Sequence, residues 1–194
     1  KGVQITHRNI LSQVFGMAEH GGATSGDVFV SWMPLYHDMG LFGYHMLPIL
    51  LGAKQVLMNP FLFIRKPLTW LQKLSKHGGS ITAAPNFGLS RVIQSIRPGS
   101  LEGLDLSSVR CILNGSEPIN VDIMESFTQA LQPAGLPETA MSPGYGLAEA
   151  TLAVTMLTPE EKSRIQWLDR SSLDSPEGVI SVPKDHPDAI ALTD

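Results

Sequence analysis

The sequence predicts an α/β fold, a mainly parallel sheet with helices on both faces. Short runs of β-branched and aromatic residues alternate with amphipathic helical patterns along most of the chain. Each strand–helix unit takes roughly 25–30 residues, which is enough for the crossover that joins two parallel strands. The units differ in sequence, so the pattern indicates βαβ units and not a solenoid of repeats.

The first half of the chain carries clear start and stop signals. A helix follows Thr6, a good N-cap, and ends at Gly21 and Gly22. A buried strand over 28–33 stops at Pro34. The same signals predict, in this order, a helix over 41–51, a strand over 55–58, a helix from Pro67 to Gly78, a strand over 81–84 and a helix over 87–96.

The second half begins as regularly and then changes character. A strand over 109–113 precedes a helix capped by Asn120, and residues 141–144 lead into a helix that starts near Ala148. The buried stripe expected on the helix after Asn120 is Ile123, Phe127, Ala130 and Leu131. The composition turns polar at Thr158, which predicts a loop or insertion over 158–177, a strand over 179–182 and a last strand, cut short, over 189–194.

Two regions follow from this division: an α/β core over 1–157, and a polar loop or insertion with a truncated strand region over 158–194. The first residue is Lys1, and Lys1-Gly2-Val3 is typical of the middle of a chain. We therefore expect a fragment of a longer protein.

Composition excludes several classes of protein. The chain has 194 residues, a formal net charge of −4 and no long basic run, so we expect no nucleic-acid partner. Its one cysteine, Cys111, is expected in the core, excludes a disulfide framework and a four-thiolate zinc site, and indicates a reducing, cytoplasmic location. The longest stretch without charged residues, 39–53, has 15 residues, fewer than the ~20 that cross a bilayer, which predicts a buried helix and no membrane span.

Four loops directly follow predicted strands, and ligands of parallel α/β sheets bind at the carboxyl ends of strands. These loops cover residues 34–40, 84–88, 114–118 and 143–149. In the last of them, Tyr145 lies between two glycines and offers a flat ring to a planar base, and Glu149 offers a hard oxygen to Mg²⁺. A tight turn with Glu149 as an exposed first-turn charge is the alternative.

The other loops also have two interpretations. The small residues of 114–118 leave room for a flat ligand, or form a turn that starts a helix. His37 can donate to an anion while Asp38 fixes its tautomer, or Asp38 simply caps a helix. Asn86 and Phe87, with methionines such as Met39, line an apolar tunnel or belong to the ordinary core. No nucleophile elbow accompanies His37, which argues against a hydrolase.

Together these motifs resemble the adenylate-forming enzymes: acyl-CoA synthetases, fatty acyl-AMP ligases, luciferases and adenylation domains of peptide synthetases. The resemblance covers about residues 1–155, with four motifs in the order of the family: 1–9, similar to the end of its phosphate loop and the next helix; 34–40; 114–118; and 145–149. Residues 37–41, the Asn86-Phe87 loop and 146–152 are most similar to fatty acyl-AMP ligases. The fold implied is part of the large N-terminal domain of an adenylate-forming enzyme.

The resemblance implies that a fatty carboxylate attacks the α-phosphate of ATP, and that the acyl-adenylate passes to a carrier-protein phosphopantetheine thiol. It implies ATP and Mg²⁺ as cofactors, and as partners a fatty acid and an acyl carrier protein or a polyketide or peptide synthase module. The implied roles are catalytic for His37 and Glu149, with Glu149 on the metal; nucleotide-binding for Gly115, Ser116, Glu117, Pro118, Tyr145, Gly146 and Ala148; and acyl-pocket for Met39, Asn86 and Phe87.

Departures from the family pattern bear on activity. Ala148 stands where many members have Thr, and neither the ribose-binding Thr-Gly-Asp motif nor the C-terminal catalytic lysine occurs in the 194 residues. Lys1 is not that lysine. We expect the fragment to be inactive and its parent protein active. The alternatives are a fragment of a fatty acyl-CoA synthetase and a non-catalytic α/β module that binds lipid or a carrier protein.

Overall fold

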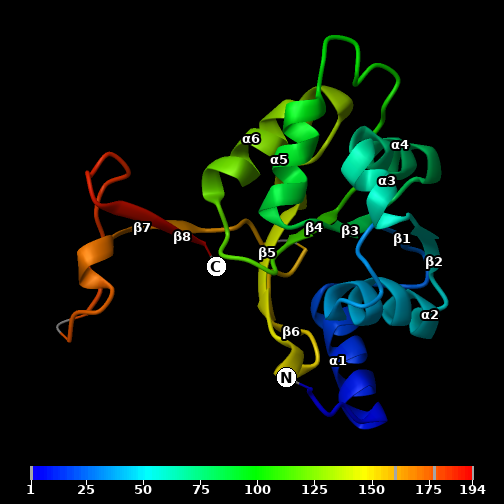
Figure 1. Ribbon diagram of the computed structural model, residues 1–194, viewed down its shortest axis with the longest axis horizontal. Helices are drawn as coiled ribbons and strands as arrows, with labels where there is room; N and C mark the ends of the chain where they lie inside the picture. Colours follow the sequence, from blue (N-terminus) through cyan, green and yellow to red (C-terminus); the bar gives the residue numbers. More distant parts are fainter. Residues whose placement is uncertain (1, 160, 177, 194) are drawn as a thin grey trace.

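The computed structural model describes residues 2–159, 161–176 and 178–193. Its main sheet has six strands in the order β2-β1-β3-β4-β5-β6 (Figure 1). The first five strands pair in parallel, and β6 joins β5 antiparallel. The strands are β1 (Val28–Ser31), β2 (Lys54–Leu57), β3 (Ile81–Ala83), β4 (Cys111–Asn114), β5 (Met141–Gly146) and β6 (Ala153–Met156). The predicted fold class, a mainly parallel sheet in an α/β protein, is confirmed.

Helices cover both faces of this sheet (Figure 1). One face carries α1 (His7–His20), the π-helix η1 (Met39–Met46) and α2 (Leu47–Leu51). The other carries α3 (Pro60–Arg65), α4 (Leu68–His77), α5 (Asn86–Ser95) and α6 (Val121–Leu131). This arrangement leaves the carboxyl ends of the parallel strands as the edge where loops from several strands meet.

Local sequence signals explain where the helices begin and end. Thr6 forms a capping box with Asn9: Thr6 Oγ1 accepts from Asn9 N at 3.2 Å, and Asn9 Oδ1 accepts from Thr6 N at 3.0 Å. Asn120 Oδ1 accepts from Ile123 N at 3.1 Å and starts α6 as predicted. Gly78 ends α4 in the left-handed conformation that glycine adopts at low cost.

The core around the central strands contains packed aromatic rings and buried side-chain hydrogen bonds. Trp32 stacks on Phe63 with ring centroids 3.8 Å apart, and Trp70 meets both rings edge-on. Trp70 Nε1 donates to Thr82 Oγ1 at 2.9 Å, and Thr82 Oγ1 donates to Val30 O at 2.6 Å. These contacts fix the central strands and therefore the loops that leave them.

A partly buried ion pair joins the segments at the amino ends of the strands. Arg110 Nε donates to Asp27 Oδ1 at 2.9 Å and Arg110 Nη2 to Asp27 Oδ2 at 2.8 Å, while its Nη1 reaches Gly21 O at 3.1 Å. Burial alone would raise the pKa of Asp27, but hydrogen bonds from Arg110, Thr24 and Ser80 hold it at about 2. Nearby, Cys111 packs against the core as predicted, and burial raises its pKa to about 11.

Several predicted helix and strand limits need correction. The helix expected over 41–51 begins at Met39, and its first part is a π-helix. The short helix α3 was not predicted, and β4 starts at Cys111, two residues after the expected start of the strand over 109–113. On α6 the buried face is Val121, Met124, Phe127 and Leu131, so Ile123 and Ala130 of the predicted stripe are only half-buried.

The region after β5 differs most from the prediction. Only a short 3-10 turn (Ala148–Ala150) stands where a helix was expected near Ala148, and the antiparallel strand β6 follows it. The predicted loop over 158–177 contains the strand β7 (Ile165–Asp169), with Glu177 outside the described residues. The strand predicted over 179–182 is reduced to a single bridge between Ser181 and Leu168.

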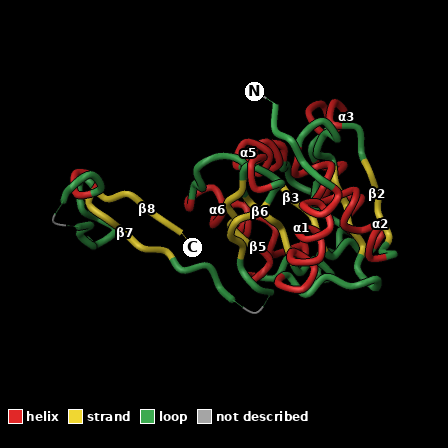
Figure 2. Tube along the Cα trace, turned by 90° about the horizontal axis from the view of Figure 1, so that it is seen from below, coloured by secondary structure: helices red, strands yellow, loops and turns green. Residues whose placement is uncertain are grey.

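A strand at the end of the chain is confirmed as β8 (Ala189–Thr193), with Asp194 outside the described residues. It pairs with β7 in a separate two-stranded ribbon that projects from the main body (Figure 2). The division at residue 157 into a core and a polar region stays a prediction. No described helix is long and apolar enough to span a membrane.

Candidate functional site

Loops from three strands meet at the carboxyl edge of the sheet and enclose a cavity of about 220 Å³, here called the first cavity. His37 and Met39 come from the segment after β1, Ser116 follows β4, and Tyr145 and Gly146 end β5. A second cavity, of about 400 Å³, adds Glu117 and Pro118. Both cavities share a wall made of Ser116, Gly144, Tyr145, Gly146 and Thr155. The structure thus brings together residues that the sequence places more than a hundred positions apart.

The His37 loop is held by its own short contacts. His37 Nδ1 lies 2.8 Å from Asp38 Oδ1 and accepts from Met39 N at 3.1 Å. Asp38 Oδ1 also accepts from Met39 N at 2.7 Å and caps η1, while its predicted role in fixing the tautomer of His37 stays a prediction. The loop turns so tightly that a Cβ on residue 40 would overlap the carbonyl of Pro34, and therefore Gly40 is needed there.

The turn after β4 presses against β5. A Cβ on Gly115 would lie 2.8 Å from Gly144 O, so only glycine allows this approach. Ser116 has a φ of 70°, in the left-handed region that non-glycine residues rarely adopt. Glu117 and Pro118 then lead past the second cavity toward α6. The predicted nucleotide turn is therefore a narrow, strongly shaped segment beside Tyr145.

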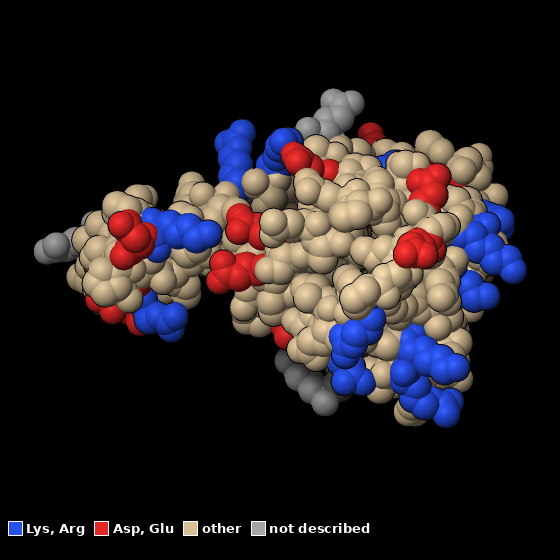
Figure 3. All heavy atoms as spheres, turned by 90° about the horizontal axis from the view of Figure 1, so that it is seen from above, with Lys and Arg blue, Asp and Glu red and all other residues tan. Residues whose placement is uncertain are grey.

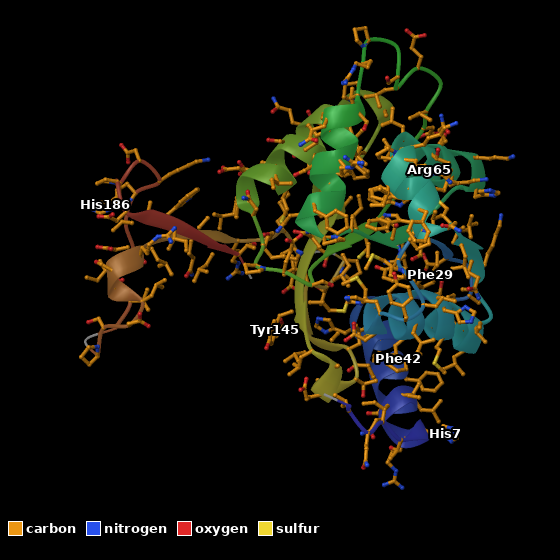
Figure 4. All side chains as sticks on the ribbon, viewed as in Figure 1. His7, Phe29, Phe42, Arg65, Tyr145 and His186 are labelled. Atoms are coloured by element: carbon orange, nitrogen blue, oxygen red, sulfur yellow. The ribbon has the colours of Figure 1, made fainter. Side chains whose placement is uncertain are left out.

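Tyr145 is 61% exposed although it lines both cavities. Figure 4 shows its side chain projecting outward from β5, where a flat ligand can reach the ring. Gly146 closes the turn, since a Cβ there would overlap Leu152 O of the return strand. Tyr145 and Gly146 therefore have the geometry expected of a base-binding turn.

Ala148 and Glu149 lie apart from this group. They occupy the exposed 3-10 turn between β5 and β6 and line neither cavity. Among the described residues, no group of three or more His, Cys, Asp and Glu side chains is placed to hold a metal ion. A metal at Glu149 would thus need most of its ligands from substrate and water, as Mg²⁺ commonly does. The metal role of Glu149 stays a prediction.

The predicted acyl-pocket residues separate into two groups. Met39 is buried and lines the first cavity together with Leu113 and Leu152. Asn86 and Phe87 start α5 and line neither cavity. The Phe87 ring packs edge-on against Trp32, 5.8 Å away. A pocket role for Asn86 and Phe87 stays a prediction.

Sequence reasoning missed the contribution of β6. Leu152, Ala153 and Thr155 line the first cavity, and all three lie on or beside this antiparallel strand. The β-branched residues Val154 and Thr155 could have indicated a strand, but the glutamate-bearing segment before them was interpreted as a helix start. The signals for the phosphate-loop end lie on Lys1, which is outside the described residues, and on the start of α1.

Charged side chains are few in this protein. Figure 3 shows acidic and basic side chains scattered around a mostly uncharged centre on the face it presents. This agrees with the low share of charged residues, 16% of the sequence.

Comparison with known proteins identifies relatives of the whole segment. A family model described as AMP-binding enzyme matches residues 1–172. The long-chain-fatty-acid–AMP ligase FadD32 of Mycolicibacterium smegmatis is 39% identical over 196 residues, covering 98% of this chain and 31% of that protein. A medium-chain fatty acid ligase of Moorena producens that acts on acyl carrier protein, JamA, is 33% identical over 183 residues, with 94% and 31% covered.

A solved structure shows the same arrangement in three dimensions. The fatty acyl-adenylate ligase from Legionella pneumophila, in complex with acyl adenylate and pyrophosphate, superposes with a TM-score of 0.94 at 36% identity. The match covers 100% of this chain and 34% of that chain. The chain thus spans about a third of the length of the relatives that it matches.

Proposed function

Because this chain belongs to the AMP-binding enzyme family, we propose that the protein containing it joins a fatty carboxylate to ATP and forms an acyl-adenylate. In this reaction the carboxylate oxygen attacks the α-phosphorus, the bond to the bridging oxygen breaks, and pyrophosphate leaves. Similarity to ligases that are named for long-chain and medium-chain fatty acids supports a fatty acid as the substrate.

One observation carries this proposal: His37, Ser116, Tyr145 and Gly146 converge on one cavity from three different strands. A nucleotide and an acid must meet in one place for their atoms to react, and a shared wall between two cavities provides such a place. Residues spread over separate faces of the molecule would have excluded the reaction.

Each residue group has a distinct task in this proposal. The flat ring of Tyr145 and the narrow 115–118 turn lie side by side, and together they hold the flat adenine. His37 lies where an anionic carboxylate or phosphate oxygen would enter the first cavity. Met39, Leu113 and Leu152 offer an apolar wall to the first methylenes, each of which contributes about 0.8 kcal/mol on burial.

We assign Mg²⁺ to Glu149. A single carboxylate with the phosphate oxygens of the substrate and water is a common way for proteins to hold this ion. When bound, the ion would neutralise charge on the phosphates as pyrophosphate leaves. Glu149 stands three positions after Gly146, in the exposed 3-10 turn between β5 and β6, and Ala148 beside it carries only a methyl group.

We propose a phosphopantetheine thiol of an acyl carrier protein, alone or in a polyketide or peptide synthase module, as the acyl acceptor. The similarity to JamA, which is named for that acceptor, supports this choice. The single cysteine of the chain supports a reducing compartment, the cytoplasm, as the place of the reaction. Transfer to coenzyme A is the alternative, and offering the full-length protein both acceptors side by side separates the two.

The direct test is ATP–pyrophosphate exchange by the full-length protein with fatty acids of different lengths. We expect exchange that depends on the fatty acid. We expect none from residues 1–194 alone, because this segment covers only 31% of the relatives' length. Absence of fatty-acid-dependent exchange by the full-length protein would contradict the proposed function.

A further inference from the structure

We propose that Asn86 is a positioning residue for the nucleotide side of the site, and that it acts by holding the 115–120 turn. The inference rests on the proposed function only in naming the nucleotide as the ligand of that turn. It assigns Asn86 a different task from the acyl-pocket role that the sequence suggested.

The side chain of Asn86 bonds the backbone of the turn at two points. Asn86 Nδ2 donates to Pro118 O at 2.8 Å, and Asn86 Oδ1 accepts from Asn120 N at 3.2 Å. Asn86 is only 6% exposed, so water competes little for these bonds. Donor and acceptor of one amide are thus both used to fix two backbone groups two residues apart.

Further bonds join the same two segments. Phe87 N donates to Glu117 Oε1 at 3.1 Å, which places the carboxylate at the amino end of α5, where the helix dipole favours negative charge. From the other side, Asn114 Nδ2 donates to Ala84 O at 2.8 Å, and Ala84 N donates to Leu113 O at 3.0 Å. We call this set of bonds between 84–87 and 113–120 the turn clamp.

The turn needs such support because its conformation is costly. Ser116 is held at a φ of 70°, in the left-handed region, which is unfavourable for a residue with a side chain. Conformations of this kind persist only where the surrounding structure determines them strongly. Since Ser116 belongs to the shared wall of both cavities, the turn clamp sets the shape of that wall.

The position of Asn86 does not favour contact with an acyl chain. Among the described residues that line the two cavities, Asn86 does not appear. Both polar ends of its side chain are occupied by backbone groups of the turn. The amide therefore acts on the nucleotide side through Pro118 and Asn120.

The test uses the full-length protein and three variants. Asn86→Ala removes both bonds and should raise the KM for ATP about tenfold. The net contribution of a hydrogen bond is modest, so the loss of two is expected to cost about one factor of ten. The KM for the fatty acid and the ranking of chain lengths should stay within about twofold of wild type. Asn86→Asp keeps the acceptor for Asn120 N but places a negative oxygen against Pro118 O, and should raise the KM for ATP at least as much as Asn86→Ala. Gln94→Ala removes an exposed amide from the same helix and should leave all constants unchanged.

The outcomes separate the roles. A changed chain-length ranking with an unchanged KM for ATP would overturn the proposal in favour of the acyl pocket. If Asn86→Ala fails to fold, Asn86→Asp decides, and a wild-type KM for ATP in that variant would also overturn the proposal.

Failure of the proposed function is visible separately, as absence of acyl-adenylate formation by wild type. In that case hydrogen exchange of the 115–120 backbone decides about the turn clamp. Faster exchange at Asn120 in Asn86→Ala than in Gln94→Ala supports it, and equal exchange in the two variants contradicts it.

Discussion

The ring of Tyr145 is an exposed aromatic surface on the wall that the two cavities share. It stands between two glycines that cannot carry side chains without overlap, so no neighbour in the turn can replace the ring. Stacking of a base on an aromatic side chain contributes about 1–3 kcal/mol. At the scale of single residues, affinity for the nucleotide should therefore depend strongly on this position.

We expect Tyr145→Ala in the full-length protein to weaken AMP binding about ten- to hundredfold, in line with the loss of about 1–3 kcal/mol of stacking. Tyr145→Phe keeps the ring and should bind AMP within about threefold of wild type. Titration calorimetry of both variants measures the effect. Equal affinities of the alanine and phenylalanine variants would show that the ring is not a stacking surface.

Glu149 tests the assignment of the cation. Glu149→Gln removes the charge but keeps the size, and we expect the rate of adenylation to fall about a hundredfold or more. The rate is measured at increasing magnesium concentration, with Glu102→Gln as an exposed control outside the site. A wild-type rate of Glu149→Gln at saturating magnesium would remove Glu149 from this role.

At the scale of elements, glycines decide how closely the segments approach. Gly40 lets the loop after β1 fold back on Pro34, whereas Gly16, exposed in the middle of α1, faces open space where a Cβ would stand. The same substitution should therefore have opposite effects at the two positions.

We expect Gly40→Ala to lower the free energy of unfolding by about 2–3 kcal/mol through the forced overlap with Pro34. Gly16→Ala should raise it by about 0.5–1 kcal/mol, because alanine loses less backbone entropy in a helix. Urea unfolding of both variants gives the comparison. Destabilisation by Gly16→Ala of the same size as by Gly40→Ala would contradict this account.

The elements that the sequence predicts well are those whose signals are local. Thr6 and Asn120 cap their helices with their own side chains, and Gly78 supplies a left-handed end. The strand β6 pairs with its sequence neighbour β5 and was missed because the segment before it was interpreted as a helix start. The strand β7 carries no comparable local signal, because it is stabilised by pairing with the distant strand β8. The role of Asn86 is hidden for the same reason, since its partners lie 32 and 34 positions further along the chain.

The candidate site follows the same division. Parallel strands order the loops by a general rule, so the meeting of His37, Ser116 and Tyr145 could be predicted from the sequence. The separation of Glu149 and Ala148 from that group could not, because it depends on the sharp return of the chain at Gly146 into an antiparallel strand.

At the scale of the whole molecule, the Asp27–Arg110 pair joins four elements. Asp27 precedes β1 and Arg110 precedes β4. Arg110 also donates to Gly21 O at the end of α1, and Ser80, just before β3, donates to Asp27. Asp27 is 8% exposed and the Arg110 side chain 30%, so the pair is only partly shielded from water, and its loss would affect all four elements.

This pair makes stability depend on pH. The pKa of Asp27 in the folded chain, about 2, lies below the ordinary value of 3.8, so the stabilisation is complete above about pH 5 and is lost as the pH falls toward 2. We expect the pair to account for a decrease on the order of 1–2 kcal/mol over that range. Urea unfolding at pH 7, 5 and 3 should show a shallower decline for Asp27→Asn than for wild type. Parallel declines in the two proteins would contradict the assignment.

Because the two cavities share one wall, a change in that wall alters the shape of both cavities. A side chain at Gly144 would press on Leu113 on one side and on the Thr155 carbonyl on the other. Under the proposed function, a mutation that reshapes this wall for the acid would therefore also change the binding of the nucleotide. Variants that accept bulkier acids are therefore expected to gain the additional space at positions outside β5.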